Sequence, residues 1–123
     1  HAFFDRLGQE AGWPDKLTVD LVLCCEELLT NTITYGFGED RPSGTREIRL
    51  SVTAGPGSVT LELADNAAPF NPLLRPDPDL TLDLEQRPVG GLGVYFVKRI
   101  MDELHYEPAT PGPGNKLILR KYL

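Results

Sequence analysis

The sequence predicts an α+β domain, a two-layer sandwich in which helices cover one face of a mixed, mostly antiparallel sheet. Apolar residues recur at helical spacing near the start of the chain and again after residue 92, whereas they alternate with polar residues over 48–63 and 116–123. Helical segments and strand-like pairs are grouped along the chain rather than strictly alternating, which is typical of α+β folds. The length of 123 residues suits one hydrophobic core, so we expect a single domain over 1–123.

The composition argues against some classes of function. A net charge of −6 at pH 7 disfavours nucleic-acid binding, which needs a basic surface. No apolar run is long enough for a membrane span. A phosphate site remains open, because backbone N–H groups and Mg²⁺ hold phosphates without a basic surface. The two cysteines, Cys24 and Cys25, are adjacent and form no disulfide framework, so we expect a cytoplasmic protein.

Two helices are predicted at the start of the chain. Residues 2–11 place four apolar side chains at helical spacing, and Gly12 ends this short helix. A longer amphipathic helix is expected over 15–35, with Gly36 after it. Its expected core face consists of Leu17, Leu21, Cys25, Leu28, Leu29, Thr32 and Ile33.

Glu27 and Asn31 are expected to lie off that apolar face. They are four residues apart, so they stack one helical turn above the other and point the same way. A carboxylate beside a carboxamide suits metal binding and proton transfer. Two solvated polar residues on an ordinary helix are the simpler interpretation, and the helix alone favours it.

The period changes to that of strands in the middle of the chain. Alternation over 48–52 and 59–63 predicts an antiparallel hairpin around a Gly-Pro-Gly turn, and its second strand ends at Asp65-Asn66. From residue 67 to residue 89 five prolines and scattered acids leave no period. A segment of this length is either a disordered insertion or a lid over a site.

A glycine-rich turn, 90–93, precedes the last predicted helix. Such a turn brings free N–H groups to the positive end of a helix, which suits an anion, although glycines serve equally as a plain turn. A strand beginning over 105–107 and a final strand over 116–123 complete the chain. The expected apolar face of the helix consists of Phe96, Val97, Ile100, Met101 and Leu104.

Three of these segments resemble the motifs of one family. EELLTNTITYG (26–36) is similar to the N box of the GHKL ATP-binding fold, LADNAAPFNP (63–72) to its first glycine box, and GGLGVYFVKRIMDELHYE (90–107) to its second. The second box and the short length are most similar to the bacterial anti-sigma-factor serine/threonine kinases. The match in order and spacing covers nearly the whole chain.

The resemblance implies an ATP site that uses Mg²⁺. Asn31 matches the asparagine that coordinates the Mg²⁺ bridging the phosphates, and an amide oxygen is a hard ligand that suits this ion. Glu27 matches the catalytic glutamate, which would accept the proton of an attacking serine hydroxyl. Asp65 matches the aspartate that accepts a hydrogen bond from the adenine amino group.

The two glycine boxes complete the implied ATP-binding residues. Gly91, Leu92 and Gly93 match the end of an ATP lid, expected at about 66–91, where the backbone faces the phosphates. Ala67 stands where the family usually has glycine, and a Cβ atom there could crowd the adenine.

Other positions also depart from the family pattern. The last strand of the family often carries a threonine near the adenine, and the nearest positions here are Ile118 and Leu119. Arg75 and Arg87 are the basic residues of the lid that could reach a γ-phosphate. Family members usually have a strand before the first helix, which would precede His1.

The family implies a kinase that phosphorylates an anti-sigma-factor antagonist and binds a sigma factor in the bacterial cytoplasm. Exposed helix faces could support a homodimer. The alternative is a non-catalytic, nucleotide-sensing interaction module of the same fold, which the alanine at position 67 motivates. An ATPase or histidine-kinase domain is a weaker interpretation, because a histidine kinase also needs a phospho-accepting helical domain.

Overall fold

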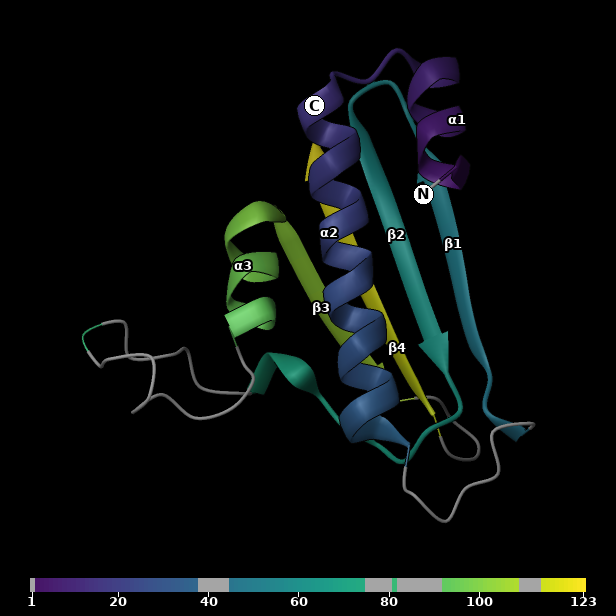
Figure 1. The fold of residues 1–123 in the computed structure, drawn as a ribbon, viewed down its shortest axis with the longest axis vertical. Coiled ribbons are helices and arrows are strands. Elements are labelled where there is room, and N and C mark those ends of the chain that lie inside the picture. Colours follow the sequence, from purple (N-terminus) through teal and green to yellow (C-terminus); the bar gives the residue numbers. More distant parts are fainter. Residues whose placement is uncertain (1, 38–44, 75–80, 82–91, 109–113) are drawn as a thin grey trace.

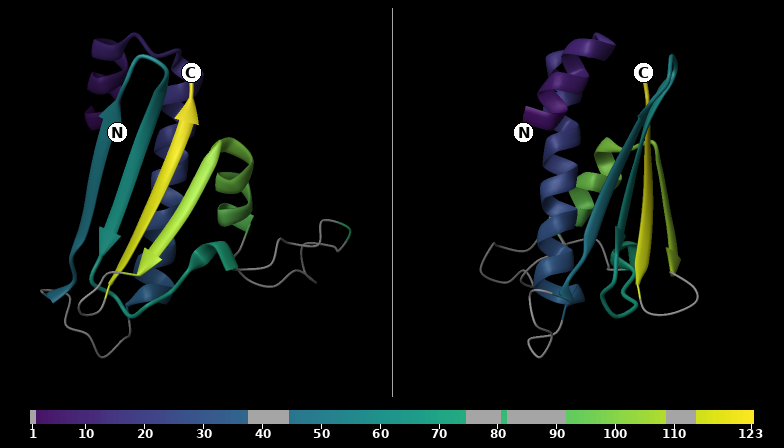
Figure 2. Two further views of the ribbon diagram at one scale, coloured as in Figure 1. Left: turned by 180° about the vertical axis from the view of Figure 1, so that it is seen from behind. Right: turned by 90° about the vertical axis from the view of Figure 1, so that its right-hand side faces the viewer.

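The computed structural model describes residues 2–37, 45–74, 81, 92–108 and 114–123, which form two layers (Figure 1). Four strands make one sheet in the order β1-β2-β4-β3, and the helices lie on one face of it (Figure 2). The predicted α+β class is confirmed, and each described pairing is antiparallel. In chain order the elements are α1 (Ala2–Ala11), α2 (Asp15–Asn31), η1 (Thr32–Gly36), β1 (Ile48–Ala54), β2 (Ser58–Asp65), η3 (Pro72–Leu74), α3 (Leu92–Ile100), β3 (Glu103–Pro108) and β4 (Asn115–Tyr122).

The core lies between α2 and the two central strands. Alternate residues of β2 and β4 point toward the helices, and Leu61 and Leu119, which are paired across the two strands, are fully buried. Leu21 of α2 is also fully buried. Each such leucine contributes about 1.5–3 kcal/mol of transfer free energy. Within the described ranges, no helix combines the length and the apolar character needed to cross a membrane.

The long helix ends earlier than predicted. Its α-helical part stops at Asn31, and the next five residues form a π turn, in which the N–H of Phe37 donates to the carbonyl of Thr32 at 3.1 Å. A π turn holds more residues than an α turn, so later side chains leave the 3.6-residue pattern. Ile33, which we expected in the core, is therefore 53% exposed.

The last helix is also shorter than predicted. It ends at Ile100, and the N–H of Asp102 donates to the carbonyl of Arg120 at 2.9 Å, which brings the chain into the sheet. Strand β3 consequently begins at Glu103, two residues before the predicted start. Leu104 packs on the core from this strand and not from the helix.

Both cysteines are buried, although only Cys25 was expected in the core. Cys24 is 1% exposed and Cys25 is 3% exposed. Burial raises the pKa of each thiol from 9.0 to about 12, and the nearby Asp20 carboxylate adds to the effect on Cys24. Both side chains therefore act as small, protonated core residues.

Candidate functional site

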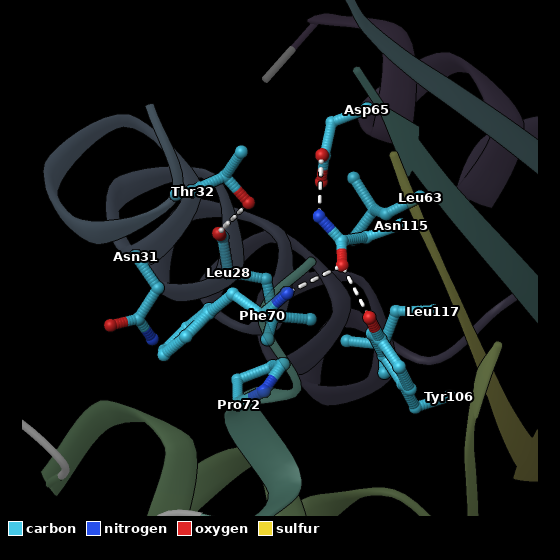
Figure 3. Close-up of a pocket in the computed structure, with 11 residues that line it drawn as sticks. Leu28, Asn31, Thr32, Leu63, Asp65, Phe70, Pro72, Tyr106, Asn115 and Leu117 are labelled. Carbon is cyan, nitrogen blue, oxygen red and sulfur yellow. Dashed lines mark hydrogen bonds between the residues drawn. The ribbon is translucent and has the colours of Figure 1, made fainter. Parts of the chain in front are cut away.

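A pocket opens where the end of α2 meets the edge of the sheet. Residues from α2, β2, β3, β4 and the segment after β2 converge on it (Figure 3). The described residues that line it are Leu28, Asn31, Thr32, Gly36, Leu63, Asp65, Phe70, Pro72, Tyr106, Asn115 and Leu117. Most of this lining is apolar, and the polar atoms come from a few side chains, which is the usual composition of a small-molecule site.

The carboxylate of Asp65 lines this pocket, and one of its two oxygens accepts hydrogen bonds from the protein. Asp65 is the last residue of β2, and its Oδ1 accepts the N–H of Ala67 at 2.9 Å and Nδ2 of Asn115 at 2.9 Å. Within the described part of the chain, no protein donor bonds to its Oδ2. One carboxylate oxygen therefore holds the local structure, and the other is available to accept a hydrogen bond from a ligand.

Asn115 lines the pocket although no sequence pattern predicted it. We expected the position near the adenine at Ile118 or Leu119, but these residues pair with Glu62 and Leu61, in the middle of β2. Asp65 pairs with Asn115, the first residue of β4. The antiparallel order gives the reason, because the end of one strand lies opposite the start of its neighbour.

The Ala67 side chain packs against Gly36. It is fully buried, and its Cβ is 3.3 Å from the place that a Cβ on Gly36 would occupy, at the end of the π turn. The methyl group is therefore accommodated by the missing side chain of Gly36. It does not belong to the described lining of the pocket, where we expected it to crowd an adenine.

Asn31 contributes an uncommitted amide. We expected it off the core face, but it is only 9% exposed, because it lies at the last α-helical turn against the pocket. Its side chain makes no hydrogen bond to any other described residue. Figure 3 shows Asn31 and Asp65 on opposite sides of the pocket, with Phe70 next to Asn31 in this view.

The chemistry of Asn31 fits Mg²⁺. The ion takes hard oxygen ligands and usually keeps waters and substrate phosphates around one or two protein ligands. An amide oxygen at the edge of a pocket, without a hydrogen bond to another described residue, is such a ligand. Among the described residues, no group of three or more His, Cys, Asp or Glu side chains could hold a metal, so a protein-only cage is not available there.

Glu27 lies beside this pocket and not in it. The exposed side chain lies over Gly93 of α3, and a Cβ on residue 93 would be 2.7 Å from the carboxylate carbon of Glu27. These two residues line a neighbouring depression together with Leu23, Cys24, Phe96, Val97 and Ile100. The structure therefore groups Asn31 with Asp65, and Glu27 with Gly93.

The end of the predicted lid is described only in part. Leu92 is the first residue of α3 and Gly93 the second, so the carboxylate of Glu27 lies near the positive end of that helix. Gly91, Arg75 and Arg87 lie outside the described residues, as does most of the segment 66–91.

Comparison with known proteins finds a family model and two relatives that match this chain. The family model of the histidine kinase-like ATPase domain matches residues 1–121. The serine/threonine-protein kinase BtrW of Bordetella bronchiseptica is 30% identical over 105 residues, which cover 85% of this chain and 72% of that protein. The serine-protein kinase RsbW of Listeria monocytogenes is 23% identical over an alignment of 123 residues, which covers 95% of this chain and 73% of that protein. The resemblance found in the three sequence boxes is thereby confirmed, and the chain belongs to the histidine kinase-like ATPase domain family.

Proposed function

We propose that the chain is an ATP-dependent protein serine/threonine kinase. The observation that carries this proposal is that Asn31 and Asp65, which are far apart in the sequence, line one pocket while Glu27 lies one helical turn from Asn31. A ligand for Mg²⁺ and a general base serve phosphoryl transfer itself, because positioning and electrostatics do most of the catalysis, and an acceptor for the adenine amino group would hold the nucleotide. The names of the two relatives as protein kinases support it.

Each residue has a separate task in this proposal. Asp65 would accept a hydrogen bond from the adenine amino group through Oδ2, and Asn31 would ligate Mg²⁺ through its amide oxygen. Bound Mg²⁺ would neutralise charge on the phosphate oxygens. Glu27 would accept the proton of the attacking hydroxyl, a step that typically contributes about 10²–10⁴-fold. The backbone at Gly93, where α3 begins, would face the phosphates.

The partners follow from the family resemblance. We propose that the serine substrate belongs to an anti-sigma-factor antagonist and that the chain also binds a sigma factor in the bacterial cytoplasm. A homodimer is part of the same proposal, since Phe96 and Val19 leave about half of their surfaces exposed on the helical layer. These three proposals concern partner recognition and are separate from the chemistry of the pocket.

A second function rests on a specific observation. Glu27 lines the depression beside α3 and contacts Gly93, and it does not line the pocket that holds Asn31 and Asp65. A module that binds ATP, changes conformation and holds a partner would need the pocket but no general base. This non-catalytic module is the alternative.

Phosphoryl transfer to the partner separates the two functions. The chain would be incubated with ATP labelled at the γ-phosphate and a purified antagonist, and the same assay would be run on Glu27→Gln. The kinase proposal expects labelled antagonist with the parent chain and a loss of at least about a hundredfold in the variant, with ATP binding retained. Glu26→Gln, which neutralises the neighbouring exposed carboxylate, is the control. ATP binding without labelled partner would favour the non-catalytic module.

A further inference from the structure

Asn115 commits its whole side-chain amide to protein partners. Its Nδ2 donates to Asp65 Oδ1 at 2.9 Å and to the carbonyl of Ala68 at 3.0 Å. Its Oδ1 accepts the N–H of Phe70 at 2.8 Å and the hydroxyl of Tyr106. An amide offers two donors and accepts two hydrogen bonds, so its capacity is filled. Two acceptors on one side and two donors on the other also fix which way the amide points.

The four partners come from different parts of the site. Asp65 ends β2, Tyr106 belongs to β3, and Ala68 and Phe70 belong to the segment that follows β2. Asn115 itself is 6% exposed, so these bonds are shielded from water, and breaking them leaves buried polar groups unpaired. A side chain that is already saturated has no group left for a nucleotide. Its contribution to binding must therefore act through its partners.

We propose that Asn115 is a positioning residue, which orients Asp65 toward the adenine in the proposed nucleotide pocket. By holding Oδ1 of Asp65, it orients the carboxylate so that Oδ2 stays available for the exocyclic amino group of a purine. By holding Ala68 and Phe70, it also fixes the path of the chain directly after β2. This inference rests on the proposed nucleotide site and assigns a task within it to a residue that does not touch the nucleotide.

The substitution Asn115→Asp tests whether the amide positions Asp65 or only stabilises the fold. It keeps the shape of the side chain but replaces the NH₂ group that faces Asp65 with a carboxylate oxygen. Two facing carboxylates cannot both remain ionised at little cost, so the pKa of the pair rises and one proton is shared at lower pH. The titratable described residues of this pocket are Asp65 and Tyr106, and the tyrosine can still donate to residue 115.

The affinity for ATP with Mg²⁺ would be measured by calorimetry on the parent chain, Asn115→Asp and Asn66→Asp at about pH 8 and about pH 6, each relative to the parent at the same pH. Asn66→Asp is the charge-matched control, since its side chain bonds the backbone of Thr45 and Glu47 instead. We expect Asn115→Asp to bind at least about tenfold more weakly at the higher pH and to recover at least about fivefold at the lower, because sharing a proton restores the donor. We expect Asn66→Asp to stay near the parent at both.

Each of the following results would overturn the inference. Unchanged affinity in Asn115→Asp would show that the amide does not position Asp65. An equal loss at both pH values, with the fold intact by circular dichroism, would show a purely structural role. No nucleotide binding by the parent chain would overturn the proposed function itself and this inference with it. If Asn115→Asp is unfolded at the higher pH, Asn115→Leu replaces it, and an affinity equal to that of the parent would be the overturning result.

Discussion

Oε2 of Glu27 lies 2.0 Å from the position that a Cβ atom on Gly93 would occupy. The carboxylate therefore rests against bare backbone at the second residue of α3, a place that only glycine leaves open. This contact joins the N box to the second glycine box. It also explains in steric terms why the last residue of the glycine-rich turn is a glycine.

The first prediction concerns Gly93→Ala. The added methyl must push the carboxylate of Glu27 aside, and this is cheap in stability because the clashing atoms are the end of a flexible side chain. We expect the free energy of unfolding in urea to change by less than about 1 kcal/mol, since alanine also favours the helix. Phosphoryl transfer to the partner should fall at least about tenfold, because the displaced carboxylate of Glu27 is no longer aligned to act as the general base.

Gly57→Ala is the control for this variant. Nothing lies within 4 Å of a Cβ built at Gly57, which is in the turn between β1 and β2, so transfer should stay at the parent level. Full activity in Gly93→Ala would contradict the catalytic assignment of Glu27.

The second prediction concerns the metal ligand. Asn31→Ala removes the uncommitted amide oxygen without breaking a side-chain hydrogen bond within the described residues. We expect the affinity for ATP to weaken at least about tenfold when Mg²⁺ is present and to change little when Mg²⁺ is removed by a chelator. Calorimetric titrations with and without the metal measure both quantities.

Thr30→Ala changes the exposed neighbour on the same helix and should leave both affinities unaltered. An Asn31→Ala variant that weakens ATP binding equally with and without Mg²⁺ would point to a packing role for the asparagine.

The third prediction concerns the thiols. With a pKa of about 12, Cys24 and Cys25 hold almost no thiolate in the folded chain, so both should react with a disulfide reagent far more slowly than in urea at about pH 8. Absorbance of the released thiol measures the rate. Rapid modification of the folded chain would show that α2 opens locally.

The same thiols predict how stability depends on pH. The unfolded chain releases these protons near 9.0, whereas the folded chain keeps them up to about 12. The contribution to the free energy of unfolding is therefore fully present below 9.0 and is lost as the pH rises toward 12. Urea titrations of the parent chain against Cys24→Ala across that window measure it, since the variant should show a weaker decline.

The two-layer fold could be predicted from the sequence, because hydrophobic period determines which segments form helices and strands. Asp65 was also placed correctly at the end of its strand. Position 115 was not found, because no local pattern states which residue of β4 lies opposite Asp65. The pairing of Asp65 with Asn115 depends on the register of two strands that are far apart in the sequence.

Two local features could not be predicted from the sequence patterns, for another reason. The π turn after Asn31 keeps the amphipathic appearance of the preceding helix while it changes the number of residues per turn, so Ile33 was misplaced. Leu104 fits the helical spacing of α3 by coincidence. The chain has left the helix before this residue, because the N–H of Asp102 donates to the carbonyl of Arg120 in the sheet. In both places tertiary hydrogen bonding overrides a pattern that the side chains alone suggest.

The pairing of β2 with β4 has a consequence for how the molecule opens. These central strands contain Leu61 and Leu119, which are fully buried, and their amides should exchange with solvent only on global unfolding. Asp65 and Asn115 stand at the end of this slowest-exchanging unit, whereas Glu27 rests on the short helix α3. The acceptor proposed for the adenine should therefore stay in place until the sheet as a whole unfolds, whereas the contact between Glu27 and α3 does not belong to that pair of strands.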